Sequence, residues 1–130
     1  MTESWMIHDD SPVHVSSETV PKTLRSRLDS GRLETWLTSS HGRSLAFVTN
    51  TGRAMVMLLE EEGDPGEHAV DPGAQGTSGG FVLAHGQEDE YPNEDTVPLQ
   101  EALRLVQHMA RAPGRWTHAG WPIAETVAVP

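Results

Sequence analysis

The chain has 130 residues, with nine Lys and Arg against 19 Asp and Glu, and a net charge of −10 when the histidines are neutral. This length fits one domain with a single modest core. The negative charge argues against binding to nucleic acid or to an anionic membrane surface, and it favours a basic protein partner. Because the sequence has no cysteine, we expect neither a disulfide nor a thiolate zinc site, and the cytoplasm is the simplest location.

The N-terminal residues 1–19 are mostly polar and contain two short apolar segments, residues 5–7 and 13–15. We expect an edge strand or an ordered arm here. The segment has neither the positive n-region nor the apolar h-region of a secretory signal. No apolar stretch in the chain approaches the roughly 20 residues that a membrane-spanning helix needs.

Residues 20–30 predict a short helix. Three apolar residues spaced by four share one face of it: Val20, Leu24 and Leu28. Pro21 suits the first turn of a helix, and Gly31 is a usual C-cap residue. The helix should therefore begin near residue 20 and end near residue 30.

Residues 32–40 and the two apolar runs that follow predict strands. In the first segment Leu33, Thr35 and Leu37 alternate with polar residues and Trp36, which indicates a strand with one wet face that carries the tryptophan. The apolar runs at residues 44–50 and 54–60 are joined by a short Asn- and Gly-containing connection, which is typical of a β-hairpin. We expect this hairpin to form the centre of the sheet.

The segment after the hairpin is rich in glycine and proline. Residues 61–79 offer too little apolar surface to offset the entropy of ordering, so we predict a poorly ordered or weakly packed loop. Residues 80–86 then supply one more short strand.

Residues 98–112 form the best helical pattern in the chain. Apolar residues recur at spacings of three and four: Leu99, Ala102, Leu103, Val106, Met109 and Ala110. Pro98 suits the helix start, and Pro113 with Gly114 ends the helix. We expect its apolar face to pack on the sheet.

Residues 115–122 are interpreted as a last strand, and the residues after it as a tail.

These elements predict a single α+β domain over residues 20–124, preceded by the arm at residues 1–19 and followed by a tail at residues 125–130. The sheet should be mostly antiparallel with about five strands, and two helices should accompany it. The main helix is the one at residues 98–112.

Five carboxylates lie close together just before this helix: Glu88, Asp89, Glu90, Glu94 and Asp95. The last two precede the helix start, where free N–H groups and the helix dipole favour negative charge. The first three repel one another unless solvent or a cationic partner screens them. From Glu60 to Glu101 the chain has twelve carboxylates and no Lys or Arg. Three interpretations of this acidic segment remain: a solvated loop, a docking face for a basic protein, and a metal site.

Catalytic motifs are absent from the sequence. There is no GxSxG elbow, no phosphate-binding glycine-rich loop after a strand, no HExxH and no cysteine nucleophile. Two groups have the composition of a site without any sign that they converge: His8, Asp9, Asp10 and His14 for a metal, and His85, Glu88 and Glu90 for acid/base chemistry. We therefore expect that the protein is not an enzyme and that it binds neither a metal ion nor a cofactor.

The tryptophans have two interpretations. Trp36, Trp116 and Trp121 suit core and rim packing, which is the usual role of aromatic residues. In a chain with few aromatic residues, tryptophans near an acidic patch are also typical of interface hot spots.

The order of these parts resembles the immunity proteins of bacterial polymorphic toxin systems, in the group called Imm-one. The resemblance covers about residues 32–122, and its most specific element is GQEDEYP at residues 86–92, which is similar to that family's strand-to-helix motif. The tryptophan-containing end is a weaker match. The family closes with a proline and two tryptophans two or three residues apart, whereas here Trp116 and Trp121 are five residues apart.

The resemblance implies an α+β fold with a central antiparallel sheet, and a protein that binds and neutralises a cognate toxin inside the producing cell. The toxins of this family include nucleic-acid deaminases and nucleases, which commonly carry basic faces, and no catalysis by the immunity protein is implied. We expect these partner-binding residues: Glu88, Asp89, Glu90, Tyr91, Glu94, Asp95, Trp116 and Trp121. Tyr91 and Pro92 should turn the chain into the helix. A small binding or regulatory module with an unrelated partner is the alternative, followed by an enzyme, and the sequence does not predict the oligomeric state.

Overall fold

A computed structural model describes residues 4–8, 11–61, 63, 66–111 and 123–124. Its described part has an α+β fold with two helices and ten strands, all paired antiparallel. The main sheet has the strand order β10-β6-β5-β4-β3-β1-β2, with β9 beside β5, and a separate two-stranded sheet joins β7 and β8. The predicted fold class is confirmed, and the sheet has more strands than the roughly five expected because several strands are only two or three residues long.

The element bounds follow the predicted order of helices and strands closely in the first half of the chain. The elements are β1 (Trp5–Ile7), β2 (Val13–Val15), α1 (Val20–Asp29), β3 (Glu34–Ser39), β4 (Ser44–Thr49), β5 (Arg53–Leu59), β6 (Glu67–Ala69), β7 (Thr77–Val82), β8 (Glu88–Pro92), η1 (Asn93–Asp95), β9 (Val97–Pro98), α2 (Leu99–Arg111) and β10 (Ile123–Ala124).

The hairpin of β4 and β5 lies at the centre of the main sheet, as predicted, with β3 on its other side. Thr35 and Leu37 of β3 are buried, whereas Trp36 between them is 40% exposed. This alternation confirms that β3 has one wet face and that the tryptophan lies on it.

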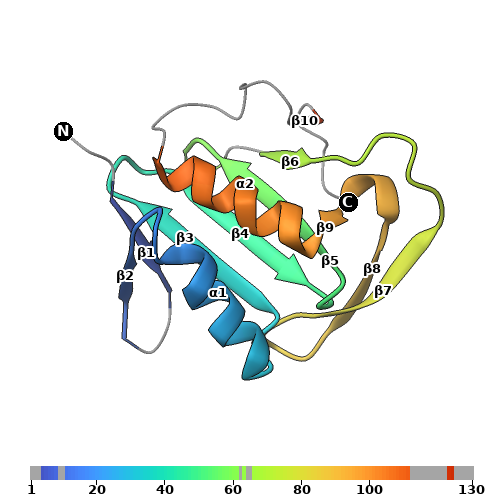
Figure 1. Ribbon diagram of the computed structural model, residues 1–130, viewed down its shortest axis with the longest axis horizontal. Helices are drawn as coiled ribbons and strands as arrows, with labels where there is room; N and C mark the ends of the chain where they lie inside the picture. The colour runs from blue at the N-terminus through green and yellow to red at the C-terminus, as the bar shows by residue number, and fades with distance from the viewer. Residues whose placement is uncertain (1–3, 9–10, 62, 64–65, 112–122, 125–130) are drawn as a thin grey trace.

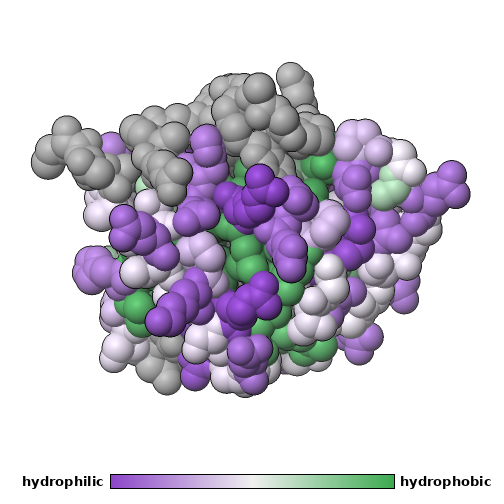
Figure 2. Space-filling view, viewed as in Figure 1, coloured by the Kyte–Doolittle hydropathy of each residue, from purple (hydrophilic) through white to green (hydrophobic). Residues whose placement is uncertain are grey.

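Both helices cover the same face of the main sheet (Figure 1). Buried apolar side chains of α1, α2 and the sheet form one core: Val20, Leu24, Leu28, Leu45, Phe47, Ala54, Val56, Leu58, Ala102, Leu103, Leu105, Val106 and Met109. Figure 2 shows the outside of this helical face, where hydrophilic groups cover most of the surface and a narrow hydrophobic strip is visible near the centre. The predicted packing of the main helix is confirmed, although α2 begins at Leu99 and Pro98 belongs to β9.

The N-terminal segment is part of the main sheet. β1 pairs with both β2 and β3, so only β2 has the edge position that the sequence suggested. Trp5 and Ile7 of β1 are buried in the core. The Arg43 guanidinium lies over the Trp5 ring, 5.4 Å from its centroid, which helps to keep this strand in place.

The predicted loop at residues 61–79 contains more regular structure than expected. β6 pairs with β5 and with β10, and its His68 and Ala69 are buried. The first half of β7 also lies in this range. β6 is an exception within this range, because backbone hydrogen bonds to neighbouring strands order a segment that has few apolar side chains. Ile123 and Ala124, at the end of the expected domain, form β10, while Trp116 and Trp121 lie outside the described residues.

Candidate functional site

The acidic segment is itself a strand. Residues 88–92 form β8, which pairs with β7 through Phe81 with Asp89 and through Val82 with Glu88. A register shift interrupts the ladder between Ser78 and Phe81. The expectation that these carboxylates follow the end of a strand is wrong, because they form a strand of their own. Strand pairing gives the carboxylates fixed positions.

The two faces of β8 differ in character. Glu88 and Glu90 are exposed on the outer face, whereas Asp89 and Tyr91 are half-buried on the inner face that Phe81 occupies. Successive side chains of a strand point to opposite sides, so three consecutive carboxylates do not share one surface. The predicted exposed patch therefore holds for Glu88 and Glu90 and fails for Asp89.

Asp89 has an internal role in the hairpin. The Tyr91 hydroxyl donates to its Oδ2 at 3.2 Å, and the Gln87 amide donates to its Oδ1 at 2.7 Å. The Tyr91 ring packs edge-on against Phe81, with 4.9 Å between the ring centroids. Burial, followed by the charge and hydrogen bond of Asp89 and the charge of Glu34, raises the pKa of Tyr91 to about 12. The phenol therefore stays neutral and works as a donor within the hairpin.

Glu34 ties the β7–β8 hairpin to the main sheet. Its Oε1 accepts from the Ala84 N–H at 2.8 Å, and its Oε2 accepts from the Trp36 indole N–H at 3.2 Å. At the other end of the hairpin the Asn50 amide donates to the Gly79 carbonyl at 2.9 Å. The hairpin is thus anchored at two places, by Glu34 of β3 and by Asn50 after β4.

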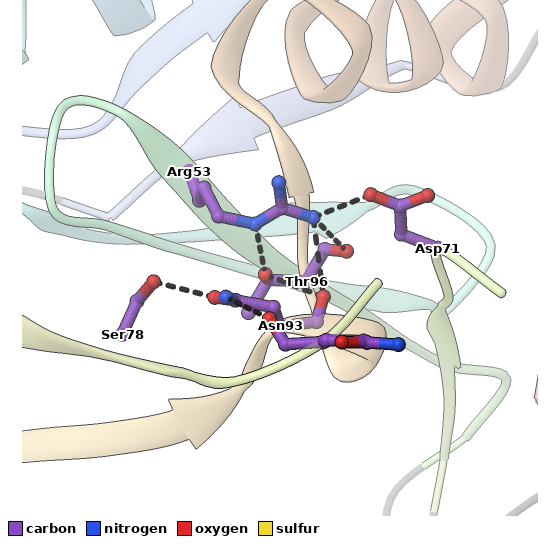
Figure 3. A network of polar contacts seen from close by, with 6 residues as sticks. Arg53, Asp71, Ser78, Asn93 and Thr96 are labelled. Atoms are coloured by element: carbon purple, nitrogen blue, oxygen red, sulfur yellow. Dashed lines mark hydrogen bonds and ion pairs between the residues drawn. The ribbon is translucent and has the colours of Figure 1, made fainter. Parts of the chain in front are cut away.

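Arg53 holds the connection between β8 and α2 (Figure 3). Its Nε donates to Thr96 Oγ1 at 2.7 Å, and its Nη2 lies 2.6 Å from Asp71 Oδ2. The same Nη2 donates to the carbonyls of Asn93 and Thr96 at 3.1 and 3.0 Å. The Ser78 hydroxyl donates to Asn93 Oδ1, which joins β7 to this network. One guanidinium therefore fixes the chain at the base of the acidic strand.

Tyr91 and Pro92 do not turn the chain into the helix as predicted, because η1 and β9 lie between β8 and α2. Glu94 and Asp95 belong to η1, and α2 begins four residues after Asp95. Asp95 Oδ1 lies 3.0 Å from His68 Nε2 on β6, while the Glu94 side chain is exposed. The two carboxylates are therefore not at the helix start, and Asp95 has a partner in the sheet instead.

A groove of about 590 Å³ lies beside the hairpin. Its walls come from the end of α1, the start of β3 and the turn between β7 and β8, which meet at one end of the molecule (Figure 1). Trp36 and Val82 line it and are 40% and 38% exposed, and the half-buried Leu33 adds apolar surface. Arg27 and Arg32 lie on the α1 side. Two of the large hydrophobic side chains that the described residues expose thus share one concavity.

The structure gives little support to the other two candidate sites, which contain His8 and His85. The His8 ring lies 3.0 Å from the Thr38 hydroxyl, and its expected neighbours Asp9 and Asp10 are outside the described residues. The His85 ring contacts the Gln87 side chain at 3.2 Å. Across the described ranges, no group of three His, Asp or Glu is arranged to hold a metal ion. None of the helices in those ranges is long and apolar enough to cross a membrane.

Three residues of this surface were missing from the predicted site: Glu34, Trp36 and Val82. The alternation in β3 did indicate an exposed Trp36, but the sequence gave no sign that the β7–β8 turn lies beside it. No protein-family model matches the chain, and a search of curated proteins finds no match.

Proposed function

We propose that this protein is an immunity protein, which binds a cognate toxin domain in the cytoplasm of the producing cell and neutralises it. The observation that carries the proposal is the outer face of β8, where Glu88 and Glu90 are exposed on a strand that is anchored to the main sheet. The resemblance at residues 86–92 supports the same function. The partner is a protein with a basic surface, such as the substrate-binding face of a deaminase or nuclease that acts on nucleic acid.

Charge supports the proposal in two ways. The chain from Glu60 to Glu101 has no Lys or Arg, so this part of the sequence supplies no basic side chain to neutralise the outer face of β8. A surface with one sign of charge speeds the encounter with a partner of opposite charge. Residues two apart on a strand are also separated by roughly 6.6 Å. Glu88 and Glu90 therefore present two negative charges at a fixed spacing, and these charges take the place of nucleic-acid phosphates on the surface of the toxin.

Rigidity is the second supporting feature. The Asp89–Tyr91 contact, the Glu34–Ala84 hydrogen bond and the Arg53 network all act on the hairpin that presents the carboxylates. A surface that is already ordered loses little conformational entropy on binding. The hairpin is therefore suited to binding a preformed basic face.

The direct experiment is neutralisation in cells. The protein encoded by the neighbouring gene is expressed alone and together with this chain, and growth is measured. Rescue of growth, with a stable complex of the two purified proteins, supports the proposal. A neighbouring product that is harmless, or a toxin that the chain neither binds nor neutralises, contradicts it and favours a binding module with an unrelated partner.

A further inference from the structure

The groove beside the hairpin and the acidic face of β8 are continuous. Val82 lines the groove and is the cross-strand partner of Glu88, which is exposed on the outer face. Gly86, in the turn that leads to β8, also lines the groove. A concavity with exposed apolar surface therefore lies next to the strand that carries the exposed carboxylates Glu88 and Glu90.

The groove has the properties of an anchor site. A volume of about 590 Å³ is in the range of small-ligand sites and so leaves room for a side chain, and Trp36 and Val82 leave apolar surface exposed inside it. The Glu34 carboxylate accepts from the Trp36 indole with one oxygen and from the Ala84 N–H, on the hairpin wall, with the other. The two walls are therefore fixed before a partner binds.

Charge and apolar surface together define the occupant. The groove is lined by Arg27 and Arg32 on the α1 wall and by Glu34 on β3, so opposite charges offset one another in part, and the exposed surface of Trp36 and Val82 favours an apolar side chain there. Glu88 and Glu90 lie on the hairpin side and favour cationic groups. An occupant that satisfies both conditions has an apolar side chain for the groove and basic residues a few positions away for the outer face of β8.

We propose that the Trp36–Val82 groove binds a protruding segment of the toxin in which an apolar side chain is followed by Lys or Arg. The apolar side chain packs between Trp36 and Val82, and the basic residues pair with Glu88 and Glu90. This inference rests on the proposed function and names the element of the toxin that the acidic surface recognises.

Short peptides test the groove without the toxin. Three acetylated and amidated peptides, Gly-Leu-Gly-Lys-Lys, Gly-Gly-Gly-Lys-Lys and Gly-Leu-Gly-Glu-Glu, are titrated into the isotope-labelled full chain. The readout is the indole N–H signal of Trp36, assigned by its loss in Trp36→Phe. We expect the first peptide to shift this signal and to bind at least about fivefold more tightly than the other two, since both parts contribute. No shift with any peptide, or equal shifts with the first two, overturns the proposal.

Val82→Ser provides the matched variant, with Val13→Ser as its control. Val82 and Val13 are 38% and 40% exposed, and Val13 lies on the edge strand β2 rather than in the groove. We expect Val82→Ser to weaken binding of Gly-Leu-Gly-Lys-Lys at least about fivefold and Val13→Ser to leave it unchanged. Equal affinities for the two variants overturn the assignment of the groove.

The toxin separates failure of this inference from failure of the proposed function. Trp36→Ala should raise the dissociation rate of the toxin complex by about 30-fold or more and leave the association rate nearly unchanged. Thermal unfolding of the variant checks that it remains folded. An unchanged dissociation rate overturns the proposal that the groove binds the toxin and leaves the proposed immunity function intact. If the wild-type chain does not bind the toxin, the proposed function fails, and this inference about the toxin fails with it.

Discussion

Val82 and Glu88 are cross-strand partners at the turn of the β7–β8 hairpin, and both side chains are exposed. The pair places an apolar side chain that lines the groove next to the first carboxylate of the acidic face. Either residue can be replaced while the other is kept. Substitutions here separate the effect of apolar contact, which acts on the dissociation rate, from the effect of charge, which acts on association.

Ionisation of Tyr91 should report on the inner face of the hairpin. Burial and, after it, Asp89 raise the pKa of Tyr91 from the usual 10.0 to about 12. Because the folded pKa lies above the unfolded value, the stability that Tyr91 contributes is complete below about pH 10 and is lost as the pH rises towards 12. Tyr91 is the only tyrosine, so the ultraviolet absorbance of tyrosinate measures it directly.

Asp89→Asn is the variant that tests this explanation. Without the carboxylate, the pKa of Tyr91 should fall and yet stay above 10, because the charge and hydrogen bond of Asp89 are gone while burial, the largest cause, remains. Glu18→Gln, an exposed carboxylate before α1, is the control and should leave the titration unchanged. A Tyr91 pKa that is the same in the wild type and in Asp89→Asn contradicts the described contact.

Replacement of Arg53 should weaken the base of the acidic strand. In Arg53→Met the carbonyl and hydroxyl oxygens of the fully buried Thr96 lose their guanidinium donors, and we expect the free energy of unfolding to fall by about 1 to 3 kcal/mol. Urea denaturation measures this change. Arg25→Met, at an exposed position of α1, should change stability by no more than about 0.5 kcal/mol. Equal stabilities of the two variants would show that the network contributes nothing.

The order of β6 can be tested with two glycines. Gly66 and Gly73 both have positive φ, 92° and 87°, so alanine at either position costs about 1 to 2 kcal/mol of backbone strain. A Cβ at Gly66 would also lie 3.1 Å from Met57 Cγ and 3.2 Å from the Leu58 carbonyl oxygen, whereas one at Gly73 meets nothing. Gly66→Ala should therefore destabilise the protein by about 1 to 3 kcal/mol more than Gly73→Ala. Equal costs would mean that the chain before β6 is loosely packed.

The packing of α2 gives a prediction about the core. Leu103 is 6% exposed, so Leu103→Ala should lower the free energy of unfolding by about 2 to 5 kcal/mol. Arg104, the next residue, has a side chain that is 71% exposed, and Arg104→Ala is the control with little effect. Chemical denaturation of both variants measures the difference. A small effect at Leu103 would contradict the assigned face of the helix.

Local periodicity explains why much of the fold was predictable. The helices, β3 and the β4–β5 hairpin each carry a spacing of apolar residues or a turn signal that belongs to the segment itself. β6 and β8 lack such a signal, because a glycine-rich or acidic segment becomes a strand only when another strand pairs with it. The acidic segment was therefore predicted as a connection, although its carboxylates were the correct place to look for a charged surface.

The candidate site was predictable only in part, for a similar reason. The concentration of carboxylates and the exposed position of Trp36 follow from the sequence. The contact between Glu34 and Ala84 joins residues 50 positions apart, and no local pattern indicates it. Without that contact the groove could not be inferred, nor could Val82 be assigned to the same surface as Trp36.

The central claim is that the outer face of β8 attracts a basic toxin. The most direct test is stopped-flow association of the toxin with the wild type, with Glu88→Gln/Glu90→Gln, and with the control Glu18→Gln/Asp29→Asn, which makes the same change in net charge at exposed positions near α1. At low salt the first variant should associate more slowly than the wild type and the control, with a weaker dependence on salt and unchanged unfolding stability. If Glu88→Gln/Glu90→Gln associates at the wild-type rate in low salt, the acidic strand does not steer binding and the claim is wrong.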